Sequence, residues 1–107
     1  MVTFEDFKKV EFKIATIKEV EEHPNADRLY VIKLDVGGES LKQVVAGVRA
    51  FYTKEQLIGK QVIVADNLQP AMLRGVESNG MILAAKDDVG FTVLTVDKQV
   101  KNGTLVT

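Results

Sequence analysis

The fold class follows from one stretch of the chain, Val10-Glu11-Phe12-Lys13-Ile14-Ala15-Thr16-Ile17-Lys18-Glu19-Val20. Its first apolar residues alternate with charged ones, which is the two-residue period of a strand with one buried face. The apolar positions then shift by one residue, and such a slip indicates a β-bulge near Ala15-Thr16. The stretch therefore predicts a long, bent strand.

Further strands are expected on both sides of a predicted hairpin turn at Gly37-Gly38. The segments 29–36 and 41–46 flank this turn, and the first of them alternates apolar and charged residues. Residues 61–65 and 80–85 are nearly continuous apolar runs, which indicates burial on both faces or closure of a barrel. These runs are the predicted fourth and fifth strands.

Two short helices interrupt the strand pattern. Thr3 is a suitable N-cap for a helix over residues 3–9, which we expect to lie as a lid over one end of a barrel. Thr53 and Gln56 have the spacing of a capping box, and Gly59 can adopt the left-handed conformation that ends a helix. The second helix falls between the third and fourth strands.

This order of elements predicts an all-β fold, a five-stranded Greek-key barrel of the oligonucleotide/oligosaccharide-binding (OB) type. We expect one domain over residues 1–107, with the barrel at about 10–86. Residues 87–107 contain two more short strands and a turn. Either they cap the open end of the barrel, or they pair with a second copy of the molecule.

The composition limits the possible functions. Among 107 residues, 14 basic side chains balance 15 acidic ones, so a site for a polyanion must be a local patch. The absence of cysteine excludes disulfides, thiolate metal sites and cysteine nucleophiles. The chain opens without a signal peptide and contains no stretch of membrane-spanning length, so we expect a cytoplasmic protein without membrane contact.

The sequence contains few of the residue types and motifs that catalysis requires. The chain has one histidine, His23, and two serines, and Ser78 does not lie in a G-x-S-x-G nucleophile elbow. His23 lacks the histidine or cysteine partners of a zinc site. The sequence predicts a non-catalytic binding module with no metal and no cofactor.

The segment His23-Pro24-Asn25-Ala26-Asp27-Arg28-Leu29 can be explained in two compatible ways. Proline and Asx turns suit a connection between strands. At the mouth of a barrel, however, Asn25 could meet base edges, and the Arg28 guanidinium could bind a phosphate or stack on a base.

The segment from Asn67 to Met81 is more specific. Packing and chain bending explain its apolar residues and glycines, but they explain Arg74, Ser78 and Asn79 less well. A guanidinium, a hydroxyl and an amide beside a sheet suit contacts to phosphates and base edges. The sheet adds polar residues that could share one face, although scattered lysines are also typical of a solvated surface: Lys13, Lys33, Lys42 and Gln43.

With these residues, almost the whole chain resembles the tRNA-binding domain family, which includes free-standing tRNA-binding proteins and the C-terminal domain or beta subunit of methionyl-tRNA synthetases. The resemblance depends on motifs that occur in order at family-like separations: residues 6–10, 23–29, 45–47, 67–68 and 73–81.

The resemblance implies an OB-fold barrel that binds tRNA by its shape without reading the anticodon, alone or as an accessory of methionyl-tRNA synthetase. It also implies a homodimer formed through the terminal elements. By motif position, the binding surface comprises Asn25, Arg28, Asn67, Arg74, Ser78, Asn79 and Met81, to which the sheet adds Lys33, Lys42 and Gln43.

One departure predicts weak binding. Relatives often carry basic residues around Pro70, where this chain has Gln69, Ala71 and Met72, and Asp66 adds an acid nearby. Each phosphate contact contributes roughly −0.7 to −0.9 to the slope of log affinity against log salt, so we expect a shallow slope.

Two other functions are compatible with the sequence. A dimeric peptide-binding export chaperone of similar fold would need an exposed apolar groove between subunits. A general single-strand binder would need more exposed aromatic residues than this chain offers.

Overall fold

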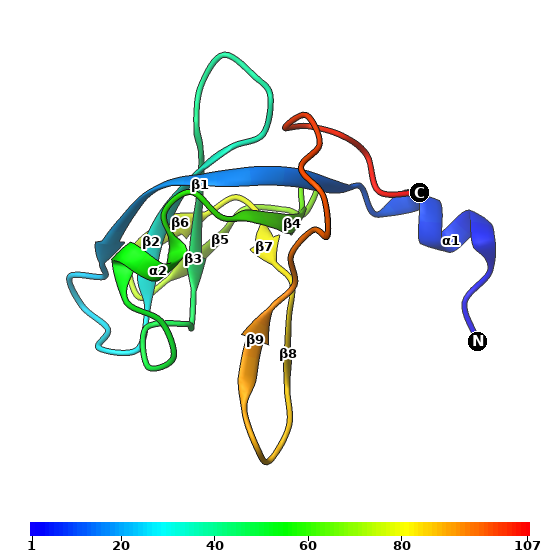
Figure 1. The fold of residues 1–107 in the computed structure, drawn as a ribbon. Coiled ribbons are helices and arrows are strands. Elements are labelled where there is room, and N and C mark those ends of the chain that lie inside the picture. The colour runs from blue at the N-terminus through cyan, green and yellow to red at the C-terminus, as the bar shows by residue number, and fades with distance from the viewer.

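The chain is built on one five-stranded antiparallel sheet. A computed structural model describes all of residues 1–107, and Figure 1 shows the sheet curling into a nearly closed barrel. The strand order is β3-β2-β1-β4-β7. The strands are β1 (Phe12–Glu22), β2 (Tyr30–Asp35), β3 (Lys42–Ala46), β4 (Gln61–Ala65) and β7 (Met81–Ile82). The predicted fold class is confirmed.

Strand β1 is long and bent, because it pairs with β4 over its first half and with β2 over its second half. Its register against β2 shifts between Ile17 and Glu19, so the extra residue is Lys18. The predicted bulge at Ala15-Thr16 is therefore wrong in position. Ile14 and Ala15 are neighbours in the chain and both are buried, so the alternation of buried and exposed residues is interrupted before the bulge at Lys18.

The core lies inside the barrel and consists of aliphatic side chains. The largest fully buried ones are Ile17, Ile32, Leu34, Val44, Leu57, Val62 and Val64. Burial of each contributes roughly 1.5–3 kcal/mol, so these side chains dominate the stability of the barrel.

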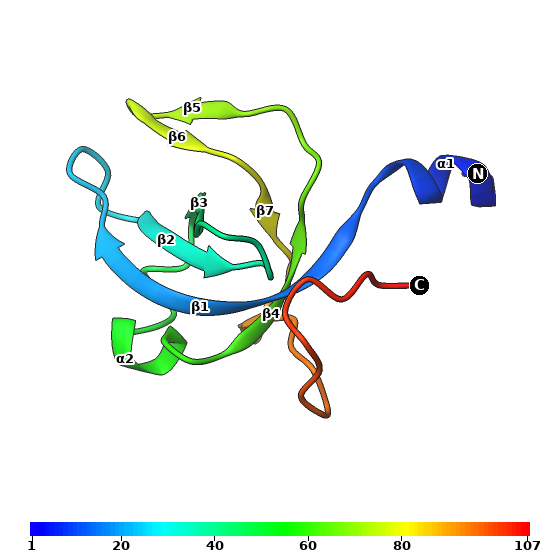
Figure 2. The same ribbon diagram turned by 90° about the horizontal axis from the view of Figure 1, so that it is seen from above.

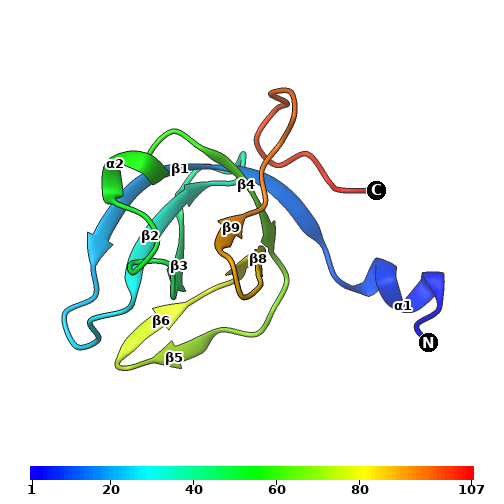
Figure 3. The same ribbon diagram turned by 60° about the horizontal axis from the view of Figure 1, so that its bottom comes forward.

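The helices differ in how they meet the barrel. Helix α2 (Lys54–Leu57) starts with the predicted capping box at Thr53 and buries Leu57 completely, and Gly59 follows at φ 91°. Helix α1 (Phe4–Lys9) has Thr3 as its N-cap but buries none of its residues. Figures 1 and 3 show α1 extending away from the barrel, so the expected lid is wrong.

The chain after β4 forms two hairpins. The first consists of β5 (Ala71–Leu73) and β6 (Val76–Ser78), in a segment that was expected to be a loop. The second consists of β8 (Ala84–Lys86) and β9 (Phe91–Val93), and it protrudes from the barrel in Figure 1. The predicted strand 80–85 is thus divided between β7 and β8, because the chain leaves the barrel after Ile82 and pairs with β9 instead.

The C-terminal segment is hydrogen-bonded to its own barrel. The amides of Gly103 and Val106 donate to the carbonyls of Ile14 and Phe12, each at 2.7 Å. Gly103 also lies so close to the β2–β3 loop that a Cβ there would be 2.6 Å from the carbonyl oxygen of Val36. These bonds attach the C-terminal segment to the first half of β1, and both predicted roles of this segment, capping the barrel and pairing with a second copy, stay predictions. No helix is long and apolar enough to span a membrane.

Candidate nucleic-acid interface

The two polar segments singled out in the sequence touch each other. The Asn25 side-chain amide donates to the carbonyl of Arg74 at 3.2 Å, and the Arg74 guanidinium donates to the carbonyl of Asn25 at 3.3 Å. In Figure 2 the tip of the β5–β6 hairpin lies beside the β1–β2 loop. The two segments are thus joined by a reciprocal pair of hydrogen bonds.

Arg74 occupies an unusual backbone position that its neighbour makes possible. Arg74 (φ 53°) and Gly75 (φ 90°) form the two-residue turn between β5 and β6. Two successive positive φ values define the tight turn that matches the twist of a hairpin, and glycine adopts the second one without strain. The turn places the Arg74 guanidinium at the exposed tip of the hairpin.

A surface hollow of about 420 Å³ lies between the two segments. It is lined by residues of the β1–β2 loop and by Arg74. Arg28 and Arg74 both line it, and neither forms an ion pair with a carboxylate. Since a guanidinium has five donors, both arginines retain N–H groups that could bind a phosphate. We call this region the arginine end.

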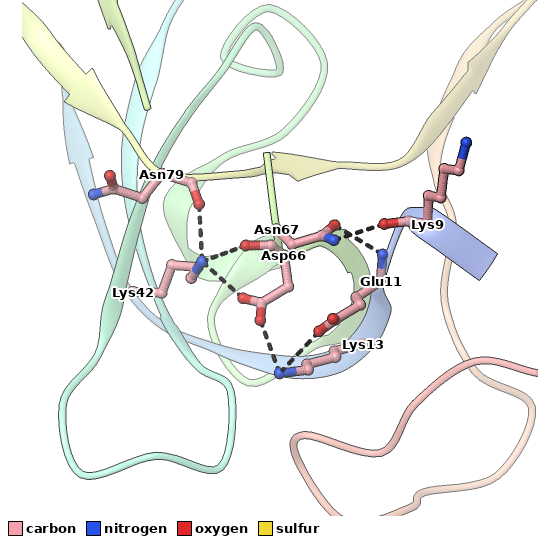
Figure 4. Close-up of polar contacts among 7 residues, drawn as sticks. All are labelled: Lys9, Glu11, Lys13, Lys42, Asp66, Asn67 and Asn79. Atoms are coloured by element: carbon pink, nitrogen blue, oxygen red, sulfur yellow. Dashed lines mark hydrogen bonds and ion pairs between the residues drawn. The ribbon is translucent and has the colours of Figure 1, made fainter. Parts of the chain in front are cut away.

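A second polar region lies at the other end of the surface, around Asp66 (Figure 4). The Lys42 ammonium donates to the carbonyls of Asp66 (2.8 Å) and Asn79 (2.9 Å), and it forms an ion pair with the Asp66 carboxylate at 2.7 Å. Lys13 contacts the other carboxylate oxygen at 2.9 Å. We call Lys13, Lys42 and Asp66 the Asp66 cluster; it joins β1, β3 and the end of β4.

The charges of the Asp66 cluster stabilise one another. Partial burial of Asp66 opposes its ionisation, but hydrogen bonds from Lys42 and Lys13 outweigh this effect, and the pKa of Asp66 lies below its ordinary value. The hydrogen bond to Asp66 raises the pKa of Lys13. Backbone carbonyls use two of the three donors of the Lys42 ammonium, and its charge is paired with Asp66, so Lys42 is less available for an RNA phosphate than a free lysine.

Other predicted site residues also make internal contacts. The Asn67 side chain accepts from the Glu11 amide at 2.8 Å and donates to the Lys9 carbonyl at 2.7 Å (Figure 4). The buried Ser78 hydroxyl accepts from the Val45 amide and donates to the Gly80 carbonyl. These side chains hold β1 and the β5–β6 hairpin in place.

Gln43 connects the hairpin to β3 as well. Its side-chain amide donates to the Glu77 carbonyl at 2.8 Å, and its backbone carbonyl accepts from the Asn79 amide at 2.9 Å. The Asn79 carboxamide makes no hydrogen bond within the chain and points away from the Asp66 cluster in Figure 4. Lys33 lies opposite Gln43 in the β2–β3 pairing and forms no ion pair, and Met81 is 57% exposed.

The structure therefore divides the predicted site residues into two groups. Lys42, Gln43, Asn67 and Ser78 use their polar groups inside the fold. The other predicted residues retain free side-chain groups: Asn25, Arg28, Lys33, Arg74, Asn79 and Met81. Sequence reasoning missed that Asp66 pairs with two lysines and that His23 contacts the β5–β6 hairpin. One signal was present for Asp66: it follows directly on a buried strand, and a charge in such a position needs a partner.

Comparisons with known proteins agree with this architecture. The sequence matches the family described as "Putative tRNA binding domain" over residues 12–105. Because this match spans most of the chain, the chain belongs to the tRNA-binding domain family.

Similar sequences occur within longer enzymes. The chain is 49% identical over 105 residues to a methionine–tRNA ligase of Pyrococcus furiosus, and the match covers 98% of this chain and 14% of the ligase. It is 44% identical over 105 residues to the methionine–tRNA ligase of Caldanaerobacter subterraneus, with 98% of this chain and 16% of that enzyme covered. The chain thus spans only about one seventh of the length of these relatives.

Two solved structures share the fold. The MetRS-related protein from Pyrococcus horikoshii superposes with a TM-score of 0.91 at 28% identity, over 100% of this chain and 98% of that one. The chaperone CsaA from Bacillus anthracis gives a TM-score of 0.88 at 28% identity, over 100% and 99%. This chain therefore shares its backbone fold with both a MetRS-related protein and a chaperone.

Proposed function

We propose that this chain binds tRNA through the arginine end and the adjoining exposed residues. One observation carries the proposal: the Asn25–Arg74 hydrogen bonds hold two motif segments together beside a hollow in which two guanidiniums lack acidic partners. Guanidiniums bind phosphate oxygens, and phosphate contacts position a protein on RNA without reading its sequence. The contact surface comprises Asn25, Arg28, Lys33, Arg74, Asn79 and Met81.

Recognition is by tRNA shape and not by anticodon sequence. No aromatic side chain lines the hollow at the arginine end. Sequence-specific binding of single-stranded RNA commonly relies on bases stacked on aromatic side chains, and this hollow offers none. A few phosphate contacts give modest affinity, in line with the scarcity of basic residues around Pro70.

The test measures the affinity for deacylated tRNA of the unmodified chain and of Arg28→Ala and Arg74→Ala. A charge-assisted hydrogen bond is worth about 1.5–3 kcal/mol, so each substitution should weaken binding roughly tenfold or more. Lys98→Ala removes the same charge from the C-terminal segment and serves as the matched control. Equal affinities for all four proteins, or no binding at low salt, would contradict the proposal.

We further propose that the chain is a non-catalytic module that delivers tRNA to a methionyl-tRNA synthetase in the cytoplasm. The likeness to segments of methionine–tRNA ligases supports this role. The test adds the chain in trans to a synthetase lacking such a segment. Aminoacylation at low tRNA concentration should rise, and it should not rise with the Arg28→Ala, Arg74→Ala double variant.

A homodimer is proposed through the N-terminal helix. Phe4 and Phe7 of α1 are 72% and 45% exposed, and together with Val10, Leu105 and Val106 they line an apolar groove of about 270 Å³. Phe7 packs on Phe12 of β1, with ring centroids 5.9 Å apart, but α1 buries none of its residues, and an exposed apolar helix face is typical of an interface. Sedimentation should give a dimer that Phe4→Lys dissociates, whereas Val89→Lys on the β8–β9 hairpin should leave it intact.

The second candidate function is peptide binding, as in a chaperone. The fold shared with CsaA and the exposed apolar side chains of Met72 and Met81 support it. Competition separates the two functions. If an unfolded polypeptide displaces tRNA and binds more tightly, the chaperone function is favoured; if it does not compete, the tRNA function is.

A further inference from the structure

The single histidine of the chain is almost fully buried, with 4% of its surface exposed. His23 follows directly on β1, where the chain enters the β1–β2 loop. Its Nε2 lies 2.8 Å from the carbonyl oxygen of Leu73, and its Nδ1 lies 2.9 Å from the backbone nitrogen of Asn25. Both ring nitrogens are therefore engaged with backbone groups, one of them fifty residues away in the sequence.

These partners determine where the proton of the ring resides. The Asn25 amide can only donate, so Nδ1 must accept. The Leu73 carbonyl can only accept, so Nε2 must carry the hydrogen. The ring is thus neutral and in the Nε2–H form, because a second proton on Nδ1 would point at the Asn25 N–H.

Leu73 lies at the tip of the β5–β6 hairpin, where a contact can hold the turn in place. It is the last residue of β5 and precedes the turn formed by Arg74 and Gly75. The hairpin is a separate two-stranded sheet, and an isolated hairpin is marginally stable in water. It therefore depends on contacts with the rest of the molecule.

Those contacts lie at opposite ends of the hairpin. Ser78 and Gln43 attach its base to β3. Asn25 and His23 attach its tip to the β1–β2 loop. The Asn25 contacts, at 3.2 and 3.3 Å, are exposed to water, whereas the His23 contact is shorter and shielded from it, so it is the stronger attachment at the tip.

We propose that His23 is a positioning residue for RNA binding: its neutral ring fixes the tip of the β5–β6 hairpin against the β1–β2 loop and so holds Arg74 beside Arg28. This role rests on the proposed tRNA function. A fixed pair of guanidiniums meets two phosphates without first being ordered, whereas a mobile tip must lose conformational entropy when RNA binds.

Two substitutions separate the two hydrogen bonds of the ring. Glutamine can place its Nε2 donor near the position of the histidine Nε2 and so retain the bond to Leu73. Asparagine can place its Oδ1 near Nδ1 and so retain the bond to Asn25, as in an ordinary Asx turn, but it is too short to reach Leu73. Both variants lose the aromatic ring, so they are matched controls for lost packing.

The experiment compares amide hydrogen exchange in the β5–β6 hairpin and tRNA affinity for the unmodified chain, His23→Gln and His23→Asn. In His23→Asn the hairpin amides should exchange roughly tenfold faster, since local opening no longer has to break the bond to Leu73, and tRNA affinity should fall roughly five- to tenfold. In His23→Gln both should stay close to the values of the unmodified chain.

The outcomes separate this inference from the proposed function. Unchanged hairpin exchange in His23→Asn would overturn the role of His23, even if tRNA binds. If the unmodified chain does not bind tRNA, the proposed function fails, and the exchange data still decide whether His23 fixes the hairpin. If both variants unfold, ¹⁵N NMR of the unmodified imidazole decides: a neutral Nε2–H ring supports the inference, and an Nδ1–H or doubly protonated ring at neutral pH overturns it.

Discussion

The arginine end and the Asp66 cluster lie on the same molecule and contain similar residues, yet they use their cations differently. Around Asp66, two lysines neutralise a carboxylate and one of them also binds two backbone carbonyls. At the arginine end, Arg28 and Arg74 form no ion pair, although Asp27 lines the same hollow. Under the proposed function, a basic residue is available to RNA only where the fold has not already used its donors.

The largest expected effect comes from removing the carboxylate of the Asp66 cluster. Asp66→Ala leaves the partly buried Lys42 ammonium without a counter-ion and Lys13 with only its 3.9 Å contact to Glu11, which should cost about 2–4 kcal/mol in the free energy of unfolding. Chemical denaturation measures this cost. Asp88→Ala, at an exposed carboxylate without an ion pair, is the control and should be nearly neutral. A similar small effect for both variants would show that the cluster contributes nothing to the fold.

The same cluster predicts how stability depends on pH. The pKa of Asp66 is lower in the folded chain than its ordinary value of 3.8, so its contribution is complete above about that pH and is lost as the pH falls through the folded value. The pKa of Lys13 is raised from 10.5, so its contribution is complete below that pH and is lost at more alkaline pH. Denaturation midpoints against pH should show the acid loss in the unmodified chain and a smaller one in Asp66→Asn.

The next largest effect is expected from changing the turn at the arginine end. Gly75→Ala forces a side chain into a positive φ of 90° and should cost about 1 kcal/mol, because alanine is strained there. Displacement of Arg74 should lower tRNA affinity by a few-fold. Gly38→Ala, where an added Cβ meets nothing and φ is not positive, is the control. Unchanged affinity in Gly75→Ala would mean that the turn geometry does not matter for binding.

The smallest expected effect is that of Asn25→Ala. It removes the exposed 3.2 Å bond to the Arg74 carbonyl while the His23 contact remains, so stability should fall by only about 0.5 kcal/mol, the low end for a hydrogen bond. Stability is measured by denaturation and hydrogen exchange. A larger loss in Asn25→Ala than in His23→Asn would mean that Asn25, and not His23, is the main attachment of the hairpin tip.

The sequence predicted the fold class because its signals are local. Alternation in β1 and β2, the apolar run of β4 and the capping box at Thr53 each belong to one contiguous segment. The errors have different causes. The position of α1 depends on which distant segment it meets, and no local pattern carries that information. The β5–β6 and β8–β9 hairpins are local pairings, but their strands are only three residues long, too short to show a clear alternation of apolar and polar residues.

For the site, residue types were predicted better than residue roles. Arg28, Arg74 and Asn25 were expected near one another, and the structure brings Asn25 and Arg74 into contact. The engagement of Lys42 by Asp66 was not expected, because it joins residues from β3 and the end of β4. Asp66 was counted only as an added acid in a segment expected to bind weakly, whereas the structure shows its charge paired with two lysines.

The central claim is that the arginine end binds tRNA and the Asp66 cluster does not. Its most direct test compares the salt dependence of tRNA binding for Arg74→Gln and Lys42→Gln, each of which removes one positive charge. Each phosphate contact contributes roughly −0.7 to −0.9 to the slope of log affinity against log salt concentration. We predict that Arg74→Gln makes the slope shallower by about that amount, whereas Lys42→Gln, measured where it remains folded, leaves the slope unchanged and lowers only stability. A slope that changes with Lys42 and not with Arg74 would contradict the account.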